Sequence, residues 1–360
     1  MADLCAKLFT PLPRSDQRRK GREYLSGLLM ARGRKSMRNI AAVVGGPAAE
    51  QSLHHFISNS TWCWRSVRRA LTEFVVQSAP PQAWVVRPMV IPKSGEHSVG
   101  VDRCFVPATG TIQTAQRAVG VWATSEEAGI PVEWRLHLPP GWLDDTPRRN
   151  RASVPEEATE ETLGDCLVEV YLEMAGRGRL PRRPVVLDAR GNDIRSIVAK
   201  LRAAKVPMLV RIAGTEELIV ADPALHGHRA TTQPAREIIK ATKATRRGVL
   251  VPGPHDAVRM RLVSSARVQV PRGTGPARGA MRLLGAGRSD IWPAEFWLTN
   301  MTEAPASALL RLAALLERVD QDFEIATSVG IRDFAGRSYE GWHRHVTLAS
   351  AAHAVVALTD

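Results

Sequence analysis

The sequence predicts an α/β protein in which a mixed β-sheet is flanked by helices. Before about position 80, apolar side chains recur at helical spacing, and from Trp84 onward short β-branched or alternating runs are separated by Gly and Pro. Residues 184–212 follow a strand, helix, strand rhythm, which is typical of two parallel strands joined by a crossover helix. With 360 residues, the chain is long enough for one large core plus an appended domain, or for two domains of ordinary size.

Residues 1–80 are expected to form a helical N-terminal module. The basic stretch RGRKSMRN at residues 32–39 leads into apolar residues at helical spacing, and Trp62 and Trp64 open another helical segment that ends near Phe74. Basic runs are most often solvated surface, but the position of this one ahead of a sheet favours DNA binding.

Residues 81–212 are expected to form the first part of the core. Strands are predicted at residues 84–91, 97–105, 117–123 and 132–138. A helix at residues 156–176, a strand at 184–188, a helix at 194–204 and a strand at 206–212 are predicted to follow.

The rest of the chain divides at about residue 300. Residues 213–300 are rich in Gly, Pro, Thr and Arg and contain short strand-like runs at 260–263, 268–270 and 296–298, so a β-rich insertion is expected. Residues 301–360 are expected to complete the core with helices near 306–326 and 339–358. In the first of these helices an apolar stripe recurs at steps of three and four residues and must face the core, formed by Leu309, Leu312, Leu316, Val319 and Phe323.

The charge balance indicates a polyanionic partner. Lys and Arg exceed Asp and Glu by 49 − 36 = 13, and arginine dominates, with 41 Arg against 8 Lys. Such an excess favours nucleic acid first and an anionic membrane surface second. A GC-rich genome also enriches a protein in arginine, so the motifs have to decide between these explanations.

The sequence predicts a cytoplasmic protein that makes no contact with a membrane. No apolar run approaches the roughly 20 residues that a membrane span needs, and the N-terminus lacks the apolar core of a signal peptide. The four cysteines form no C-x-x-C pair, so neither a disulfide framework nor a zinc site is expected from Cys5, Cys63, Cys104 and Cys166.

The order of the predicted elements points to a kind of chemistry. Several strands, then a strand that ends in Asp188, then a late helix after a long insertion is the order in which ribonuclease-H-like nucleases assemble three carboxylates. In those enzymes the carboxylates hold two divalent ions roughly 4 Å apart, which stabilise the attacking and the leaving oxygen. The fold class expected is therefore a ribonuclease-H-like α/β fold.

Five blocks of sequence carry a more specific resemblance. They are RSDQRR at residues 14–19, SLHHFISNSTWCWR at 52–65, PKSGEHSVGV at 92–101, WRLHLP at 134–139 and GRSYEGWHRHVTLA at 336–349. Together they resemble the DDE superfamily transposases of the insertion-sequence 701 type, in the same order and over nearly the whole chain. The resemblance implies a DNA transposase that cleaves and transfers strands with Mg²⁺ or Mn²⁺.

The resemblance also assigns the three catalytic acids. The first Asp of the family, shortly before the Pro-Lys-x-Gly block, falls at Arg87, and the second matches Asp188. The third acid, normally a Glu seven residues before a Lys, falls at Asp320, with Thr327 in place of the Lys. One essential carboxylate has thus become an arginine, and the active site is expected to be degenerate.

Arg87 is expected to lie on a central strand and to form an ion pair with Asp188 or Asp320. A guanidinium stays protonated at physiological pH, so Arg87 would repel the divalent ions that the missing carboxylate would hold. Two alternatives stay open. If the register is displaced, Arg87 is a strand-edge residue and Asp102 a substitute first acid. Taken alone, Asp188 is interpreted as an aspartate that caps a turn, and Asp320 as an acid on the surface of a helix.

The leading interpretation is a domesticated, transposase-derived protein that binds DNA without efficient cleavage and has no resident cofactor. Its expected phosphate contacts are Arg32, Arg34, Lys35, Arg38 and Arg65. A homodimer is compatible with this interpretation. The alternatives are an active transposase that uses Asp188, Asp320, an unrecognised third acid and Mg²⁺, and a repurposed enzyme in which Arg87 binds an anionic small molecule and Asp188 acts as base.

Overall fold

The chain folds into two compact units. The structure, a computed structural model, describes residues 2–106, 109–178, 180–225, 231–252, 258–271, 279–288 and 291–359. The first unit comprises Met1–Pro81, Arg87–Leu180 and Arg318–Asp360, and the second comprises Gln82–Val86 and Pro181–Glu317. Strand β1 (Ala83–Pro92) and helix α11 (Ala306–Ser328) each contribute residues to both units.

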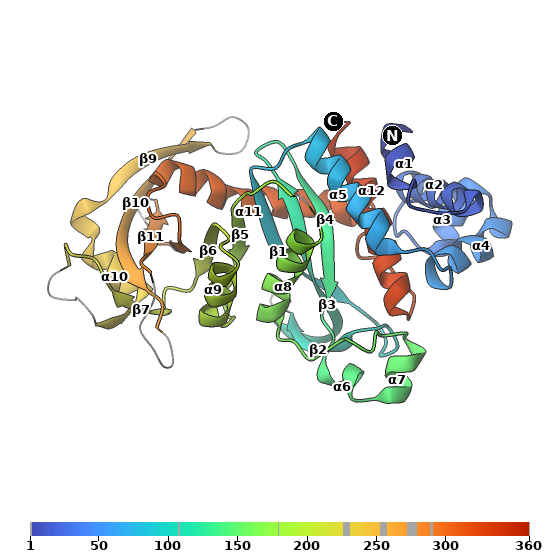
Figure 1. The fold of residues 1–360 in the computed structure, drawn as a ribbon, viewed down its shortest axis with the longest axis horizontal. Helices are drawn as coiled ribbons and strands as arrows, with labels where there is room; N and C mark the ends of the chain where they lie inside the picture. Colours follow the sequence, from blue (N-terminus) through green and yellow to red (C-terminus); the bar gives the residue numbers. More distant parts are fainter. Residues whose placement is uncertain are drawn as a thin grey trace. The chain divides into compact units, whose positions relative to one another are not determined.

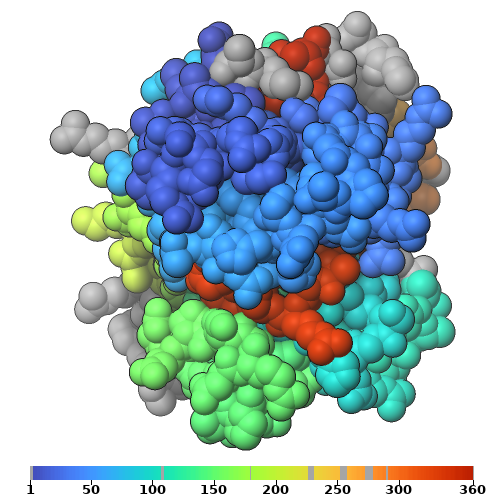
Figure 2. Space-filling model, turned by 90° about the vertical axis from the view of Figure 1, so that its right-hand side faces the viewer, coloured from blue at the N-terminus to red at the C-terminus, as the bar shows by residue number. Residues whose placement is uncertain are grey.

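The helices expected before residue 80 are present in the first unit. They are α1 (Ala2–Leu8), α2 (Ser15–Met30), α3 (Met37–Val44), α4 (Pro47–Ser58) and α5 (Trp64–Ser78). Helices α2, α4 and α5 pack against the C-terminal helix α12 (Tyr339–Ala357), and residues 341–355 of α12 are all buried. Figure 2 shows the N-terminal segment, in blue, above a strip of C-terminal chain, in red. The N-terminal helices and the C-terminal helix therefore share one core.

The sheet of the first unit is antiparallel around its longest strand. Strand β3 (Thr111–Thr124) pairs with β2 (Val101–Val106) and with β4 (Gly129–Leu136), and β1 lies next to β3. The short helices α6 (Pro140–Leu143) and α7 (Thr146–Arg151) follow β4, and α8 (Leu163–Gly176) packs on β3 and β4. In Figure 1 these strands and α8 lie beside α5 and α12.

Two of the expected elements begin later than the sequence suggested. The strand expected at residues 97–105 begins at Val101, and the helix expected at 156–176 begins at Leu163. The helix begins there because Thr162 and Asp165 form a capping box, in which each side chain accepts a hydrogen bond from the other's backbone N–H.

The second unit contains the expected parallel crossover. Strand β5 (Val185–Asp188), helix α9 (Ile194–Ala203) and strand β6 (Met208–Ile212) follow one another, and β5 pairs in parallel with both β1 and β6. Residues Trp84 and Val86 of β1 lie opposite Val185 and Leu187 of β5. These strands are apolar and buried, as strands of a parallel sheet with both faces covered usually are.

Residues 213–300 continue the same sheet with antiparallel strands. The elements are β7 (Glu217–Val220), β8 (Thr232–Pro234), α10 (Ala235–Ala241), the 3-10 turn η2 (Lys243–Thr245), β9 (Arg247–Pro252), β10 (Val258–Gln269), β11 (Met281–Gly287) and β12 (Glu295–Thr299). The strand order from β5 is β5-β6-β12-β11-β10-β7-β8, with β9 paired to β10. The two strand-like runs expected at 260–263 and 268–270 form the single strand β10.

The two units divide the chain after Pro81, Val86, Leu180 and Glu317, and the first of these divisions lies next to the boundary expected at residue 80. The further expected boundaries at 212 and 300 stay predictions. Strand β12 pairs with β6, so the β-rich segment shares backbone hydrogen bonds with the strands that precede it. Residues 1–81 group with β2 to β4 and α12 because their helices bury apolar faces against α12 and β4. Among the described residues, no helix has both the length and the apolar character needed to cross a membrane.

Candidate functional site

Arg87 and Asp320 lie together in the first unit. Arg87 is on β1, and its Nε donates a hydrogen bond to Oδ1 of Asp320, on α11, at 2.8 Å. The Arg87 guanidinium also lies 3.9 Å from the ring centroid of Phe323, one turn after Asp320. The side chain of Arg87 is 24% exposed and that of Asp320 is 64% exposed. The ion pair expected for Arg87 is confirmed, with Asp320 as its partner.

This pair does not fit a two-metal centre. A divalent cation needs carboxylate oxygens, whereas the permanent positive charge of Arg87 lies within hydrogen-bonding distance of the carboxylate of Asp320. In the described parts of the chain, no three His, Cys, Asp or Glu side chains are grouped as metal ligands. Asp320, the expected third acid, is therefore paired with an arginine, and its role as a catalytic acid stays a prediction.

Asp188 belongs to the second unit and has an arginine partner there. It ends β5, and its carboxylate accepts hydrogen bonds from the backbone N–H of Arg190 at 3.1 Å and from the guanidinium of Arg190 at 2.6 to 3.0 Å. The bond with Asp188 is the main cause that raises the pKa of Arg190. The bond to the backbone two residues later is the turn-capping contact expected of a strand-end Asp. The catalytic role of Asp188 stays a prediction.

Asp102, the alternative first acid, is exposed on β2. Its Oδ1 accepts a hydrogen bond from the backbone N–H of Arg103 at 2.8 Å. This hydrogen bond is local and does not involve Asp320.

Four of the five basic residues expected to contact phosphates are exposed. These are Arg32, Arg34, Arg38 and Arg65. Lys35 is different, and its assignment as a phosphate contact is corrected. It is only 7% exposed, its Nζ donates to the carbonyl of Ala31, and its backbone N–H donates to Asp333. Its stem packs against Gly330, where a Cβ would lie 2.5 Å from Cγ of Lys35 and where the positive φ of 96° also favours glycine.

Lys93 joins this basic region and was not singled out from the sequence. It directly follows β1, and its Nζ donates to the carbonyl of Phe334 at 2.6 Å. The pKa of Lys93 is lowered to about 8, mainly by burial and in part by the charges of Arg34 and Arg332, while Asp333 opposes the shift. Arg34, Lys93 and Arg332, which are distant in the sequence, thus lie near one another. In the sequence, this lysine belongs to the PKSG motif at residues 92–95.

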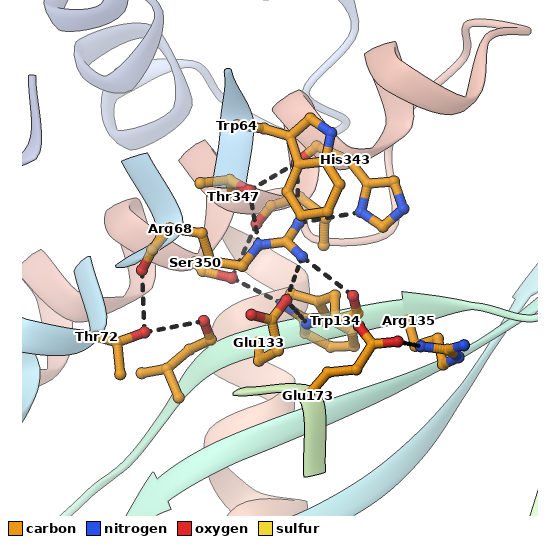
Figure 3. Close-up of polar contacts among 12 residues, drawn as sticks. Trp64, Arg68, Thr72, Glu133, Trp134, Arg135, Glu173, His343, Thr347 and Ser350 are labelled. Carbon is orange, nitrogen blue, oxygen red and sulfur yellow. Dashed lines mark hydrogen bonds and ion pairs between the residues drawn. The ribbon is translucent and has the colours of Figure 1, made fainter. Parts of the chain in front are cut away.

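Arg68 is the centre of a buried polar network (Figure 3). It lies on α5, is 1% exposed, and donates to Glu133 Oε1 at 2.5 Å and to the carbonyl of Trp134 at 3.0 Å, both on β4. It also donates to Thr347 Oγ1 at 3.0 Å and to His343 Nδ1 at 3.2 Å, both on α12. One side chain therefore ties a helix of the N-terminal segment to the sheet and to the C-terminal helix.

Three of the sequence blocks that carry the resemblance meet in three dimensions within the first unit. The blocks at 52–65, 134–139 and 336–349 supply Trp64, Trp134 and His343 around Arg68, and the ring of His343 stacks on that of Trp64 at 4.1 Å. The block at 92–101 contacts Phe334 through Lys93. These blocks therefore contribute to the scaffold of the first unit.

The mixed α/β sheet and its flanking helices are those of a ribonuclease-H-like fold. A family model of the DDE superfamily endonucleases matches residues 7–274, well over half of the 360 residues. The chain belongs to the DDE superfamily endonuclease family. None of the curated proteins matches the chain. The match includes Arg87 and Asp188 but ends before α11, the helix that carries Asp320.

Proposed function

We propose that this protein is a domesticated transposase of the insertion-sequence 701 type that binds DNA and cleaves it poorly. The observation that carries the proposal is the 2.8 Å ion pair between Arg87 and Asp320. In the register of the resemblance these are the positions of the first and third catalytic acids. An arginine at the first and an engaged aspartate at the third remove two of the three carboxylates that two-metal catalysis needs.

The charge distribution supports DNA as the partner. The chain carries a net charge of +13, and the family to which it belongs consists of enzymes that act on DNA. Arg32, Arg34 and Arg38 are exposed at and beside the loop between α2 and α3, and Arg34 lies near the partly buried Lys93. Guanidinium groups bind phosphate in a bidentate manner and do so without reading the base sequence. This region is the proposed contact with the DNA backbone.

The test separates binding from cleavage. Purified full-length protein is incubated with supercoiled plasmid and with Mg²⁺ or Mn²⁺, and a gel shift is recorded in parallel with nicking. The expected result is a shift at low salt without metal-dependent nicking. Nicking that requires metal and disappears in the Asp188→Ala variant would show an active nuclease and would overturn the proposal.

A further inference from the structure

A pocket of about 260 Å³ lies in the first unit beside the Arg68 network. Its walls come from α5, β4, α8 and α12 and from residues 155–161, and they include the side chains of Trp64, Arg65, Tyr339 and His343. A water molecule occupies roughly 30 Å³, so one water does not fill this space. Neither the family match nor the proposed catalytic acids assign a role to the pocket.

His343, one of the residues that line the pocket, has an unused hydrogen-bond donor. Arg68 can only donate, so its bond at 3.2 Å requires His343 Nδ1 to be the unprotonated ring nitrogen. Nε2 then carries the proton, and it is buried without a hydrogen-bond partner among the described residues. Figure 3 shows the two ring nitrogens on opposite sides, with Nδ1 toward Arg68. His343 itself is 1% exposed.

A buried N–H without an acceptor destabilises the empty site, so the site favours an occupant that supplies an acceptor. The aromatic ring of Trp64 stacks on His343, and the rings of Tyr339 and Trp342 meet it edge-on, so the imidazole is held in one orientation. The donor is therefore fixed in direction before any ligand binds.

The pocket wall carries Arg65, Arg135 and Arg177 together with four glutamates, and the charges that act most on His343 are positive. Burial lowers the pKa of His343 well below its usual value, and the next causes are the positive charges of Arg68, Arg65, Arg135 and Arg177. The lining acids Glu133, Glu161 and Glu173 are each engaged by arginine, at distances of 2.5 to 2.7 Å, and Glu157 is exposed to solvent.

Arg65 is the cation that remains available. It is exposed, its guanidinium lies 4.4 Å from the ring centroid of Trp64, and no Asp or Glu of the described chain forms an ion pair with it. Two hydrogen-bond donors therefore remain available at this site, the guanidinium of Arg65 and the Nε2–H of His343.

We propose that this pocket binds a phosphate group, with Arg65 and His343 Nε2–H as its donors. A phosphate offers three acceptor oxygens, so it can bond to donors that come from two different helices, which suits α5 and α12. The phosphate comes either from a free mononucleotide or from DNA. The inference goes beyond the proposed function, because it holds for either source and requires no cleavage.

The test uses the full-length protein and three probes: inorganic phosphate, adenosine monophosphate and a short DNA duplex. Binding is measured by calorimetry, and the Nε2–H signal of His343 is followed by NMR after selective ¹⁵N labelling of histidine. We expect the signal to shift on saturation with at least one probe. We expect Arg65→Ala to weaken that binding roughly 10- to 100-fold, as loss of a charged hydrogen bond does.

The matched control is Arg69→Ala. Arg69 lies one turn further along α5, is similarly exposed, and is paired with Glu73 at 2.9 Å, so its loss should leave phosphate affinity unchanged. His343→Gln, which keeps an N–H donor, should bind more tightly than His343→Leu, which does not. If either histidine variant fails to fold, Arg65→Ala and the NMR signal still decide.

The three probes distinguish the source. Binding of phosphate and of the mononucleotide assigns the site to a free ligand, and a response to the duplex alone assigns it to DNA. A His343 signal that stays unmoved by all three probes leaves only water in the pocket and overturns the proposal. Binding that is equal in the natural protein and in Arg65→Ala overturns it as well. Neither result depends on whether the protein nicks plasmid.

Discussion

Two arginines of the first unit are each paired with an acid, but the two ion pairs differ greatly in their importance for the stability of the fold. Arg68 is almost fully buried against Glu133, so removal of one partner would leave an uncompensated buried charge, which costs about 3 to 5 kcal/mol. Arg87 is partly exposed and Asp320 is largely exposed, and such a surface pair contributes about 0 to 1 kcal/mol. Arg68 is therefore a structural residue, whereas Arg87 can be replaced without unfolding the protein.

Because the ion pair between Arg87 and Asp320 contributes little to stability, the acid site can be rebuilt in a folded protein. In the variant Arg87→Asp with Asp320→Glu, two carboxylates replace the ion pair, and we expect tighter Mn²⁺ binding than in the natural protein, measured by calorimetric titration. Cleavage is not expected to return fully, because misplacement of catalytic groups by about 1 Å can cost on the order of a hundredfold in rate.

Arg87→Met with Asp320→Glu is the control, since it removes the cation without adding a carboxylate at position 87. It should bind Mn²⁺ more weakly than the full repair. If the natural protein already binds two ions as tightly as the repaired variant, Arg87 does not lie in a former metal site and the degenerate-site interpretation is wrong.

At the scale of elements, the segment between α2 and α3 combines a structural lysine with exposed arginines. Lys35 is held by Ala31 and Asp333, and Ser36 caps α3 by accepting the N–H of Asn39. The capped helix and the buried Lys35 hold the segment in place while Arg32, Arg34 and Arg38 stay in solvent. This arrangement presents positive charge on a fixed backbone.

Replacement of Arg32, Arg34 and Arg38 by alanine is expected to weaken DNA binding and to flatten its salt dependence. Each phosphate contact contributes a slope of about −0.9 on a plot of log affinity against log salt, because bound counterions are released. Fluorescence anisotropy with a labelled duplex at several salt concentrations measures the slope.

A matched triple variant of exposed arginines that are already ion-paired, Arg14, Arg19 and Arg69, controls for the loss of three charges. It should change the slope less. Equal slopes for the two triple variants would mean that the segment before and within α3 is not the DNA contact.

At the scale of the whole molecule, helix α12 couples the stability of the first unit to pH. Three of its histidines, His343, His345 and His353, are buried, and burial lowers the pKa of His345 and of His353 to about 4. The unfolded chain takes up protons at these residues near pH 6.5, whereas the folded chain does not. The free energy of unfolding is therefore expected to fall as pH decreases from about 6.5 toward 4, by up to about 1.4 kcal/mol per pH unit for each histidine.

Urea unfolding at pH 7, 6 and 5 checks this dependence. We expect His353→Gln to reduce the loss of stability between pH 6.5 and 5, since one group no longer titrates on unfolding. His97→Gln is the control, because His97 is exposed. A pH dependence that is the same in His353→Gln as in the natural protein would show that His353 does not carry the effect.

The sequence by itself determined the order and type of most elements, the family, and that Arg87 pairs with one of two acids, Asp188 or Asp320, of which the structure shows Asp320. These features follow from local signals, namely the period of apolar residues and the turn residues between strands and helices. The sequence motifs that carry the resemblance also set the register that puts Arg87 and Asp320 at one site. The helices before residue 80 and the parallel crossover around β5 are of this kind, and the structure contains them. Of the stripe expected on α11, Leu309, Val319 and Phe323 are buried, whereas Leu312 and Leu316 are half-buried.

Only the tertiary structure decided the burial of Lys35, the gathering of Arg34 with Lys93, the division into two units and the network of Arg68. In the sequence, Arg68 stands between Arg65 and Arg69 and looks like another surface cation of a basic helix. Its burial depends on β4, about 65 residues later, and on α12, about 275 residues later. Local periodicity reports which face of a helix is apolar, but whether a charged residue finds partners there depends on packing between segments that are distant in the chain, because burial of a charge is tolerated only where such partners meet it.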